Sequence, residues 1–337
     1  MYPSGKVQPI TSFEMQLGNW EKVAIVEQSN DPLIMQENDP VRKFEEIKPI
    51  ELIKTPLGET VLDLGQNMVG WLKFTVRGEA GAEVVVHHAE VLDKDGNFYT
   101  DNLRAAKQEI RYTLKGGEAE TYEPRFSFQG FRYVRLTGFP EPIQLENFTG
   151  VVLHTDMAPT GSFSCSDPLV NQLQHNIEWG LKGNFLDVPT DCPQRDERLG
   201  WTGDAQMFIR TAAHLRNIAP FFTKWSRDLA ADQREDGGVP FVIPNVLDEN
   251  SHSSSAWGDA AVICPWTIYL CYGDKRILEE QYESMAGWVE YIRKQGDDEH
   301  LWNTGFHFGD WLGLDSKPDT YIGATDRDYI ATAFYAY

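Results

Sequence analysis

Five carboxylates lie within one short segment, DVPTDCPQRDERLGWTGDAQ, which runs from Asp187 to Gln206. The acids are Asp187, Asp191, Asp196, Glu197 and Asp204. The segment has neither the period-2 pattern of a strand nor the 3.6-residue pattern of an amphipathic helix. Its two prolines also break any helix through its middle. It is therefore predicted to be mostly loop, and a loop with this density of charge suggests a functional site.

Paired carboxyl groups are the residues that cleavage of a glycosidic bond requires. One donates a proton to the leaving oxygen, and the other acts as nucleophile or as base for water. Glu197 lies six residues after Asp191 and four before Trp201. Crowding by other carboxylates and an aromatic neighbour favour a protonated acid here, whereas Arg195 and Arg198 oppose it.

Other interpretations of these charges stay open at the level of composition. A charge-rich loop is more often a solvated or salt-bridged surface, and the arginines could hold Asp187 or Asp196 by bidentate pairing. A metal site is disfavoured because the segment has no His. The run DKDGNFYTD imitates the start of an EF-hand loop but has Arg104 at the twelfth position, so a β-turn at Asp95-Gly96 is expected instead. We expect no metal and no cofactor.

Bulk properties limit the class of partner. The chain has 337 residues, 41% of them apolar, and a formal net charge of -21. Nucleic acid and anionic membrane surfaces repel such a polyanion, whereas a neutral or cationic small substrate remains open. The four cysteines lack CxxC spacing and are expected to be buried or semi-buried free thiols. The N-terminus lacks signal-peptide regions; the compartment stays open, with the cytoplasm favoured over periplasm or secretion.

Two halves of the chain differ in pattern. Residues 51–160 contain short β-branched and aromatic runs separated by Gly, Asp and Asn turns, such as VLDLG, WLKFTVRG and FRYVRLTG. This alternation predicts an antiparallel β-sandwich. Residues 1–50 show no core of their own and are interpreted as a linker or the tail of an upstream β domain.

Residues 161–337 alternate predicted helices with long loops. Asp167 or Ser166 is a candidate N-cap before Pro168, and apolar residues follow at every fourth position from Leu169 to Leu181. Further helices are expected within 204–217, 221–233, 257–273 and 275–296 and at the C-terminus. This half holds eight of the ten tryptophans.

Several of these tryptophans fall in predicted loops near carboxylates. Trp201, Trp257 and Trp311 each lie within three residues of an Asp. Aromatic faces beside carboxylates suit a sugar, because the ring packs on apolar sugar carbons while carboxylates bind hydroxyls. A place for each tryptophan in the core between helices is the competing interpretation.

The opening segment resembles the signature of bacterial α-L-rhamnosidases, D-C-P-x-R-D-E-R-x-G-W-x-G-D, over a gapless run from Asp191 to Asp204. The stretches LDLGQNMVGWLKFTVRG, YEPRFSFQGFRYVRLTG, SSSAWGDAAVICPW and FGDWL are also similar to that family. The resemblance covers residues 20–337. It implies a multidomain protein in which a β-sandwich precedes an (α/α)6 barrel, here incomplete.

The resemblance also implies an inverting glycoside hydrolase that releases terminal α-L-rhamnose from a glycoside or polysaccharide. Glu197 matches the general acid, and Asp191 and Asp204 match acids that hold rhamnose hydroxyls. The remaining candidates for the sugar pocket are Arg198, Trp201, Trp257, Asp259, Asp310 and Trp311.

The chain departs from the family at the general base, a Glu in a later loop of the barrel that no residue here matches. We therefore expect a fragment, truncated within the barrel and at the N-terminus, that is inactive alone and exposes apolar helix faces. Two rivals remain. One is a helical-barrel glycosidase or lyase for another sugar. The other is a non-catalytic carbohydrate-binding protein, which would keep its function when Glu197 becomes Gln.

Overall fold

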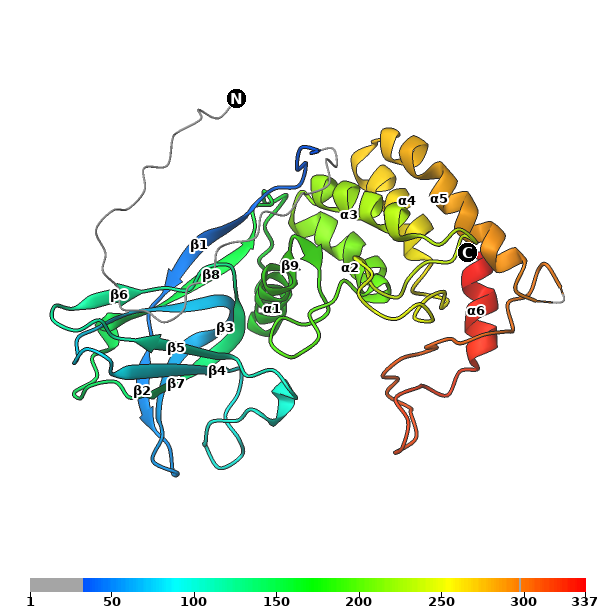
Figure 1. The fold of residues 1–337 in the computed structure, drawn as a ribbon. Helices are drawn as coiled ribbons and strands as arrows, with labels where there is room; N and C mark the ends of the chain where they lie inside the picture. The colour runs from blue at the N-terminus through cyan, green and yellow to red at the C-terminus, as the bar shows by residue number, and fades with distance from the viewer. Residues whose placement is uncertain (1–32, 297) are drawn as a thin grey trace, which may run out of the picture. The chain divides into compact units, whose positions relative to one another are not determined.

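The computed structural model describes residues 33–296 and 298–337, and Glu37–Tyr337 form one unit. Antiparallel strands come first and helices follow (Figure 1), as predicted. The expectations for residues 1–32 lie outside the described part of the chain. None of the described helices combines the length and apolar character that a membrane crossing needs.

The β domain is a single curled sheet of eight strands, in which β1, β8, β3, β7, β4 and β5 follow one another and β2 and β6 pair with β3. The strands are β1 (Val41–Ile47), β2 (Glu51–Lys54), β3 (Thr60–Val76), β4 (Glu83–Ala89), β5 (Glu109–Thr113), β6 (Glu120–Tyr122), β7 (Gln129–Thr137) and β8 (Phe148–Thr155). All these pairings are antiparallel. Since β1 pairs with β8, the sheet begins before the predicted start of the β domain at residue 51.

Two runs that the sequence suggested as separate strands form one strand, β3. Its pairing register with β7 shifts between Asp63 and Met68. Gly65 takes a left-handed φ of 72° there, and its N–H donates to Asp63 Oδ1 at 2.6 Å. The Gly therefore makes an irregularity within one strand rather than a turn between two.

The curled sheet encloses an apolar core on one face and meets the helical half on the other. Leu72 and Phe74 belong to the core, which lies between strands from both ends of the sheet. Val69 and Trp71 face the other way and pack with Leu186 of the helical half. This alternation along β3 is the pattern that period-2 side chains produce.

Six α-helices follow the sheet among the described residues: α1 (Pro168–Asn184), α2 (Thr202–Leu215), α3 (Ala219–Asp232), α4 (Ala260–Tyr272), α5 (Arg276–Arg293) and α6 (Arg327–Ala336). A short ribbon of β9 (Phe185–Leu186) and β10 (Val188–Pro189) follows α1. As predicted, Asp167 caps α1 by accepting from Leu169 N at 2.8 Å, and Gly273 ends α4 with φ 69°. The α5 helix ends at Arg293, before the expected Gly296.

One apolar face of α1 stays largely open, as expected. Leu169 and Leu173 are 79% and 57% exposed, whereas Leu181 is buried. The C-terminal part of α1 instead packs on the sheet, where Gly183 lies against Val69.

Two smaller predictions concern turns and thiols. A tight turn occupies the EF-hand-like run, where Gly96 N donates to Asp93 O and the Asp93 carboxylate accepts from the amides of Asp95 and Asn97. All four cysteines are free, as predicted. Cys192 and Cys264 are buried, but Cys165 and Cys271 are exposed, so the expectation of burial is wrong for these two.

A partly buried ion pair, in which Asp63 is the buried partner, lies at the irregular part of β3. Arg132 of β7 donates to both oxygens of Asp63, at 2.8 and 2.7 Å. Burial opposes ionisation of Asp63, but these bonds outweigh it and hold its pKa below the usual value.

We predict that Asp63→Asn lowers the free energy of unfolding by about 1–3 kcal/mol at pH 7, because hydrogen bonds to a charged group are lost. A group whose pKa is lowered in the folded state stabilises the fold at pH values above its unfolded-state pKa. That stabilisation is lost as the pH falls through the folded-state pKa. The wild-type advantage in urea titrations should therefore shrink below about pH 4. The control Glu83→Gln, in an exposed pair with Arg111, should change stability by less than about 1 kcal/mol. An equal effect of both variants would contradict the prediction.

Candidate active site

The carboxylate segment forms a loop that is closed at its base by Asp191 and Leu199. Asp191 N donates to Leu199 O at 3.1 Å, and Leu199 N donates to Asp191 Oδ1 at 3.2 Å. Arg198 lies in the left-handed region, with φ 59°. The segment then enters α2 through Trp201. The loop thus brings Asp191, Arg195 and Trp201 together around one centre.

Glu197 lies at that centre. Its Oε2 accepts from Arg195 Nε at 3.0 Å and from Arg104 Nη2 at 2.8 Å, and its Oε1 accepts from Trp201 Nε1 at 3.0 Å. Arg195 also approaches Asp191, with Nη2 3.5 Å from Oδ2. Both oxygens of Glu197 are therefore oriented by donors.

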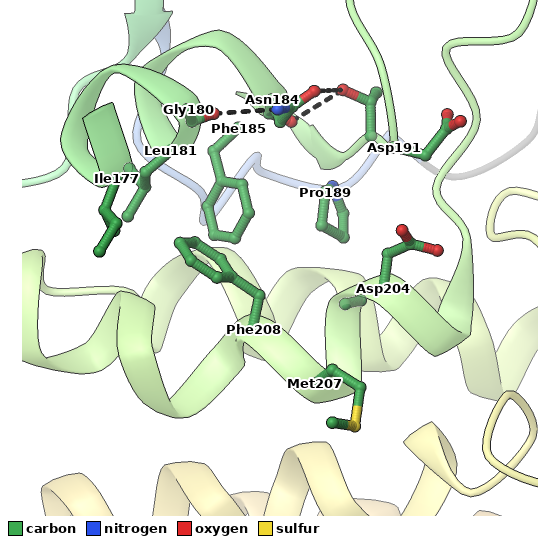
Figure 2. A pocket seen from close by; sticks show the side chains of 12 residues that line it. Ile177, Gly180, Leu181, Asn184, Phe185, Pro189, Asp191, Asp204, Met207 and Phe208 are labelled. Atoms are coloured by element: carbon green, nitrogen blue, oxygen red, sulfur yellow. Dashed lines mark hydrogen bonds between the residues drawn. The ribbon is translucent and has the colours of Figure 1, made fainter. Parts of the chain in front are cut away.

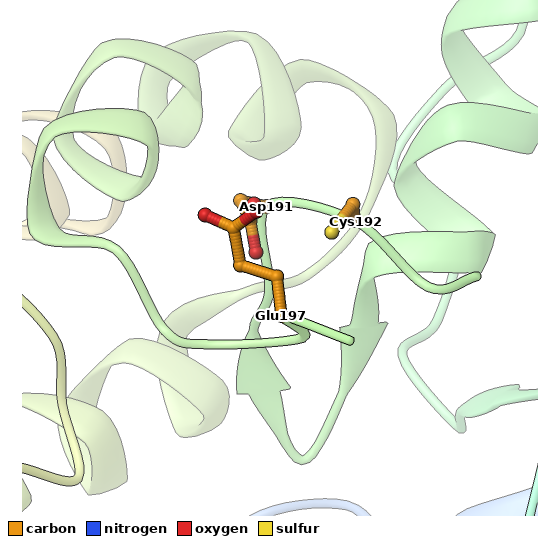
Figure 3. A group of neighbouring side chains, drawn as sticks. All are labelled: Asp191, Cys192 and Glu197. Atoms are coloured by element: carbon orange, nitrogen blue, oxygen red, sulfur yellow. The ribbon is translucent and has the colours of Figure 1, made fainter. Parts of the chain in front are cut away.

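Figure 3 shows Asp191, Cys192 and Glu197 gathered together, and one ligand atom of each lies within 4.8 Å of the other two. A metal ion would need these groups ionised. Burial raises the pKa of the Cys192 thiol to about 11, so the thiol stays protonated at neutral pH. The guanidinium groups on Glu197 also repel a cation. The group therefore suits proton transfer better than metal binding, and we assign no ion to it.

The acids of this group differ in proton affinity. Burial raises the pKa of Asp191 to about 6, and the nearby Glu197 charge adds to the effect. Burial also favours the neutral form of Glu197, but Arg195 and Arg104 outweigh it and hold its pKa below the usual value. Desolvation raises the pKa of Asp204, in the first turn of α2. In this arrangement the proton is held on Asp191 more readily than on Glu197.

The three predicted tryptophans all meet at Phe308. The centroid of its ring lies 5.9 Å from that of Trp201, 4.4 Å from that of Trp257 and 5.6 Å from that of Trp311. Trp311 is 44% exposed, and Trp257 Nε1 is buried without a hydrogen-bond partner among the described residues. An aromatic wall with one unused donor therefore begins beside Glu197.

Among the described residues, the side chains of three other predicted residues make no recorded hydrogen bond or ion pair with Glu197. Asp259 is buried and accepts from Trp288 Nε1 at 2.9 Å and Ala256 N at 2.6 Å, which favours a structural role over contact with a hydroxyl. Arg198 donates to Phe128 O at 2.9 Å and covers the Phe128 ring, so it faces the β domain. Asp310 is exposed, next to Trp311.

Sequence reasoning did not assign Arg195, Arg104 or Phe308 to the site. Arg195 had a signal, because it follows Asp191 by four residues and the structure pairs the two. Arg104 comes from the β domain, and no spacing within the loop could indicate it. Phe308 stands in the quoted stretch FGDWL, where the neighbouring Asp310 and Trp311 were chosen instead.

A pocket of about 370 Å³ opens between α1 and α2. Figure 2 shows Asp191 and Asp204 at one end and Ile177 and Leu181 at the other, with Phe208 between them. The apolar wall of the pocket suits the carbon face of a sugar, and its two acids suit the hydroxyl groups.

Comparisons with known proteins support the two-part fold. Residues 158–337 match the family described as the bacterial alpha-L-rhamnosidase 6 hairpin glycosidase domain, and residues 53–154 match the concanavalin-like domain of the same proteins. An alpha-L-rhamnosidase of Streptomyces avermitilis is 45% identical over 93% of this chain and 29% of its own length.

Two solved structures are similar. The S. avermitilis enzyme complexed with L-rhamnose superposes with a TM-score of 0.84 at 44% identity, over 90% of this chain and 29% of the other. The alpha-L-rhamnosidase of Aspergillus terreus gives a TM-score of 0.88 at 39% identity, over 92% of this chain and 36% of the other. The chain thus spans about a third of the length of these relatives.

A close packing contact accounts for a glycine in the first turn of α2. A Cβ on Gly203 would lie 2.6 Å from the Trp257 ring. We predict that Gly203→Ala lowers the free energy of unfolding by about 1–3 kcal/mol, because the ring must move. Gly180→Ala in α1 is the control, since its Cβ meets nothing within 4 Å, and it should stabilise by up to about 1 kcal/mol. Urea titration compares them, and stabilisation by both would refute the packing argument.

Proposed function

This chain belongs to the bacterial α-L-rhamnosidase six-hairpin glycosidase family, and on that premise we propose that the protein hydrolyses terminal α-L-rhamnosides. The observation that carries the proposal is the meeting of Asp191 and Glu197 beside the aromatic wall around Phe308. The two acids supply proton transfer, and the aromatic wall supplies a surface for the apolar face of a sugar. The rhamnose complex of the S. avermitilis relative supports the choice of sugar.

We assign Glu197 as the general acid. In the free site its charge is stabilised by two guanidinium groups, while Asp191, whose pKa is raised to about 6, keeps a proton only below about pH 6. Hydroxyl groups of a bound sugar that donate to Asp191 would stabilise its ionised form. The new negative charge then favours a proton on Glu197, because neighbouring carboxylates raise each other's pKa. Below about pH 6 the pair therefore carries one proton, and substrate binding moves it toward Glu197.

The sugar contacts follow from what each side chain leaves free. We assign Asp191, Asp204 and Asp310 to hydroxyl groups and the Trp201, Trp257 and Trp311 rings to the carbon face and the methyl group of a 6-deoxy sugar. Trp257 Nε1 is buried, so the ring of Trp257 rather than its N–H is assigned to the sugar. Arg198 and Asp259 are left out, because their polar groups already bind within the protein.

Inversion needs a base about 6.5–9.5 Å from the acid, so that a water fits between them. Oxygen atoms of Asp191 and Glu197 lie within 4.8 Å, which is too close for that role. We therefore propose that the base is another carboxylate, and we assign it to none of the described residues. The short separation is nearer the value of about 5–5.5 Å that a retaining enzyme needs, which makes retention the second candidate.

We predict that Glu197→Gln lowers kcat on a rhamnoside with a poor leaving group by about 10²–10⁴-fold, since protonation of the leaving oxygen is lost. The loss should be smaller on a 4-nitrophenyl rhamnoside, whose leaving group departs without a proton. The control Glu290→Gln, in an exposed pair on α5, should keep full activity. Equal losses on both substrates would move the acid to another residue.

The anomer formed first distinguishes the two mechanisms. We expect β-L-rhamnose from an α-linked substrate, because water attacks the face opposite the leaving group. Time-resolved proton NMR of the anomeric region measures this directly. Initial release of α-L-rhamnose would instead assign Asp191 as a nucleophile in a retaining reaction.

A further inference from the structure

Arg104 is the one side chain of the β domain with a recorded hydrogen bond to Glu197 among the described residues. It follows the short helix η1 (Asp101–Leu103), which lies between β4 and β5. We propose that Arg104 is a positioning residue for the general acid, supplied by the sheet domain to the catalytic loop. The inference rests on the proposed function, in which Glu197 is that acid.

The backbone and a second carboxylate fix the place of the Arg104 side chain. Its φ of 54° lies in the left-handed region, and Arg104 N donates to Asp101 O. Asp196 holds both the side chain and the following amide, with Arg104 Nε 2.8 Å from Oδ1 and Ala105 N 3.3 Å from Oδ2. The guanidinium therefore reaches Glu197 from a fixed anchor and binds two neighbouring acids at once.

Other contacts hold the loop on the sheet independently of Arg104. Gln108 Nε2 donates to Gln194 O, and Gln194 Nε2 donates to Glu90 at 2.7 Å. Arg198 binds Phe128 on the far side of the loop. Loss of Arg104 should therefore leave the loop docked while it frees Glu197 Oε2 from one of its two guanidinium groups.

Charged groups face Glu197 from three elements. The loop itself contributes Asp191, Arg195 and Asp196, α2 contributes Asp204, and the sheet domain contributes Arg104. Arg104 and Arg195 lower the pKa of Glu197, whereas the negative charges oppose them. Without Arg104 the pKa of Glu197 must rise. A general acid loses activity as pH rises through its pKa, so the alkaline limb of the rate profile must move to higher pH.

The experiment compares pH profiles of kcat/KM for the intact protein and its Arg104→Gln and Arg104→Lys variants on an aryl α-L-rhamnoside. We expect the alkaline limb of Arg104→Gln at higher pH, with kcat lower by about ten- to a hundred-fold because the acid is less well oriented. Lysine keeps the positive charge but cannot bind both acids in a fork. Arg104→Lys should therefore bring the alkaline limb back toward its wild-type pH more fully than it restores kcat.

The control is Arg111→Gln, which removes an exposed guanidinium of the same domain that pairs with Glu109 and Glu83. It should leave the limb and kcat unchanged. A merely structural role for Arg104 would lower activity at every pH without moving the limb, and that result would overturn the inference.

A second measurement separates this inference from the proposed function. In protein labelled with 13C at glutamate carboxyls, the resonance lost in Glu197→Gln reports the titration of Glu197 without any substrate. An upward shift of that titration in Arg104→Gln supports the inference even when no rhamnoside is cleaved, an outcome that would refute only the proposed function. An unmoved titration refutes the inference whatever the activity.

Discussion

The bond from Arg104 to Asp196 and Glu197 is the interaction on which the proposed site depends. A loop rich in charge and proline has few regular backbone hydrogen bonds to fix its side chains. Here the sheet domain supplies that order, through Arg104 at the carboxylates and Phe128 under Arg198. The β domain thus contributes to the proposed site, since Glu197 accepts a hydrogen bond from a residue more than ninety positions earlier in the chain.

The guanidinium groups that orient Glu197 also oppose its proposed role as an acid. Two guanidinium groups favour its ionised form, while a general acid must carry a proton. Asp191, whose pKa burial raises to about 6, resolves the conflict at mildly acidic pH by keeping a proton within the pair. The arrangement is then poised, since a change in the charge of one acid alters the proton affinity of the other.

The sequence predicted those features that depend on local pattern. Asp167 and Pro168 began a helix as expected, and period-2 runs gave antiparallel strands, because caps and periodicity act over a few residues. Prediction failed where one residue is compatible with two different local structures. Gly65 looked like the end of a strand and is an irregularity within β3.

The site was predicted in part for the same reason. Spacing within the loop brought Asp191, Glu197 and Trp201 together correctly, but it did not say which arginine faces them. Arg198, whose backbone is left-handed, directs its side chain toward Phe128. Arg195 is the arginine of the loop that contacts Asp191 and Glu197. Arg104 and Phe308 are brought in by tertiary packing, which one sequence does not reveal.

The most direct test of this account is a crystal structure of the intact Glu197→Gln protein with an uncleaved α-L-rhamnoside bound. The account predicts the side chain of residue 197 within about 3.2 Å of the glycosidic oxygen, with Asp191 on a sugar hydroxyl and the sugar carbons on the aromatic wall. A sugar bound away from this loop, or a different carboxyl group at the glycosidic oxygen, would contradict it.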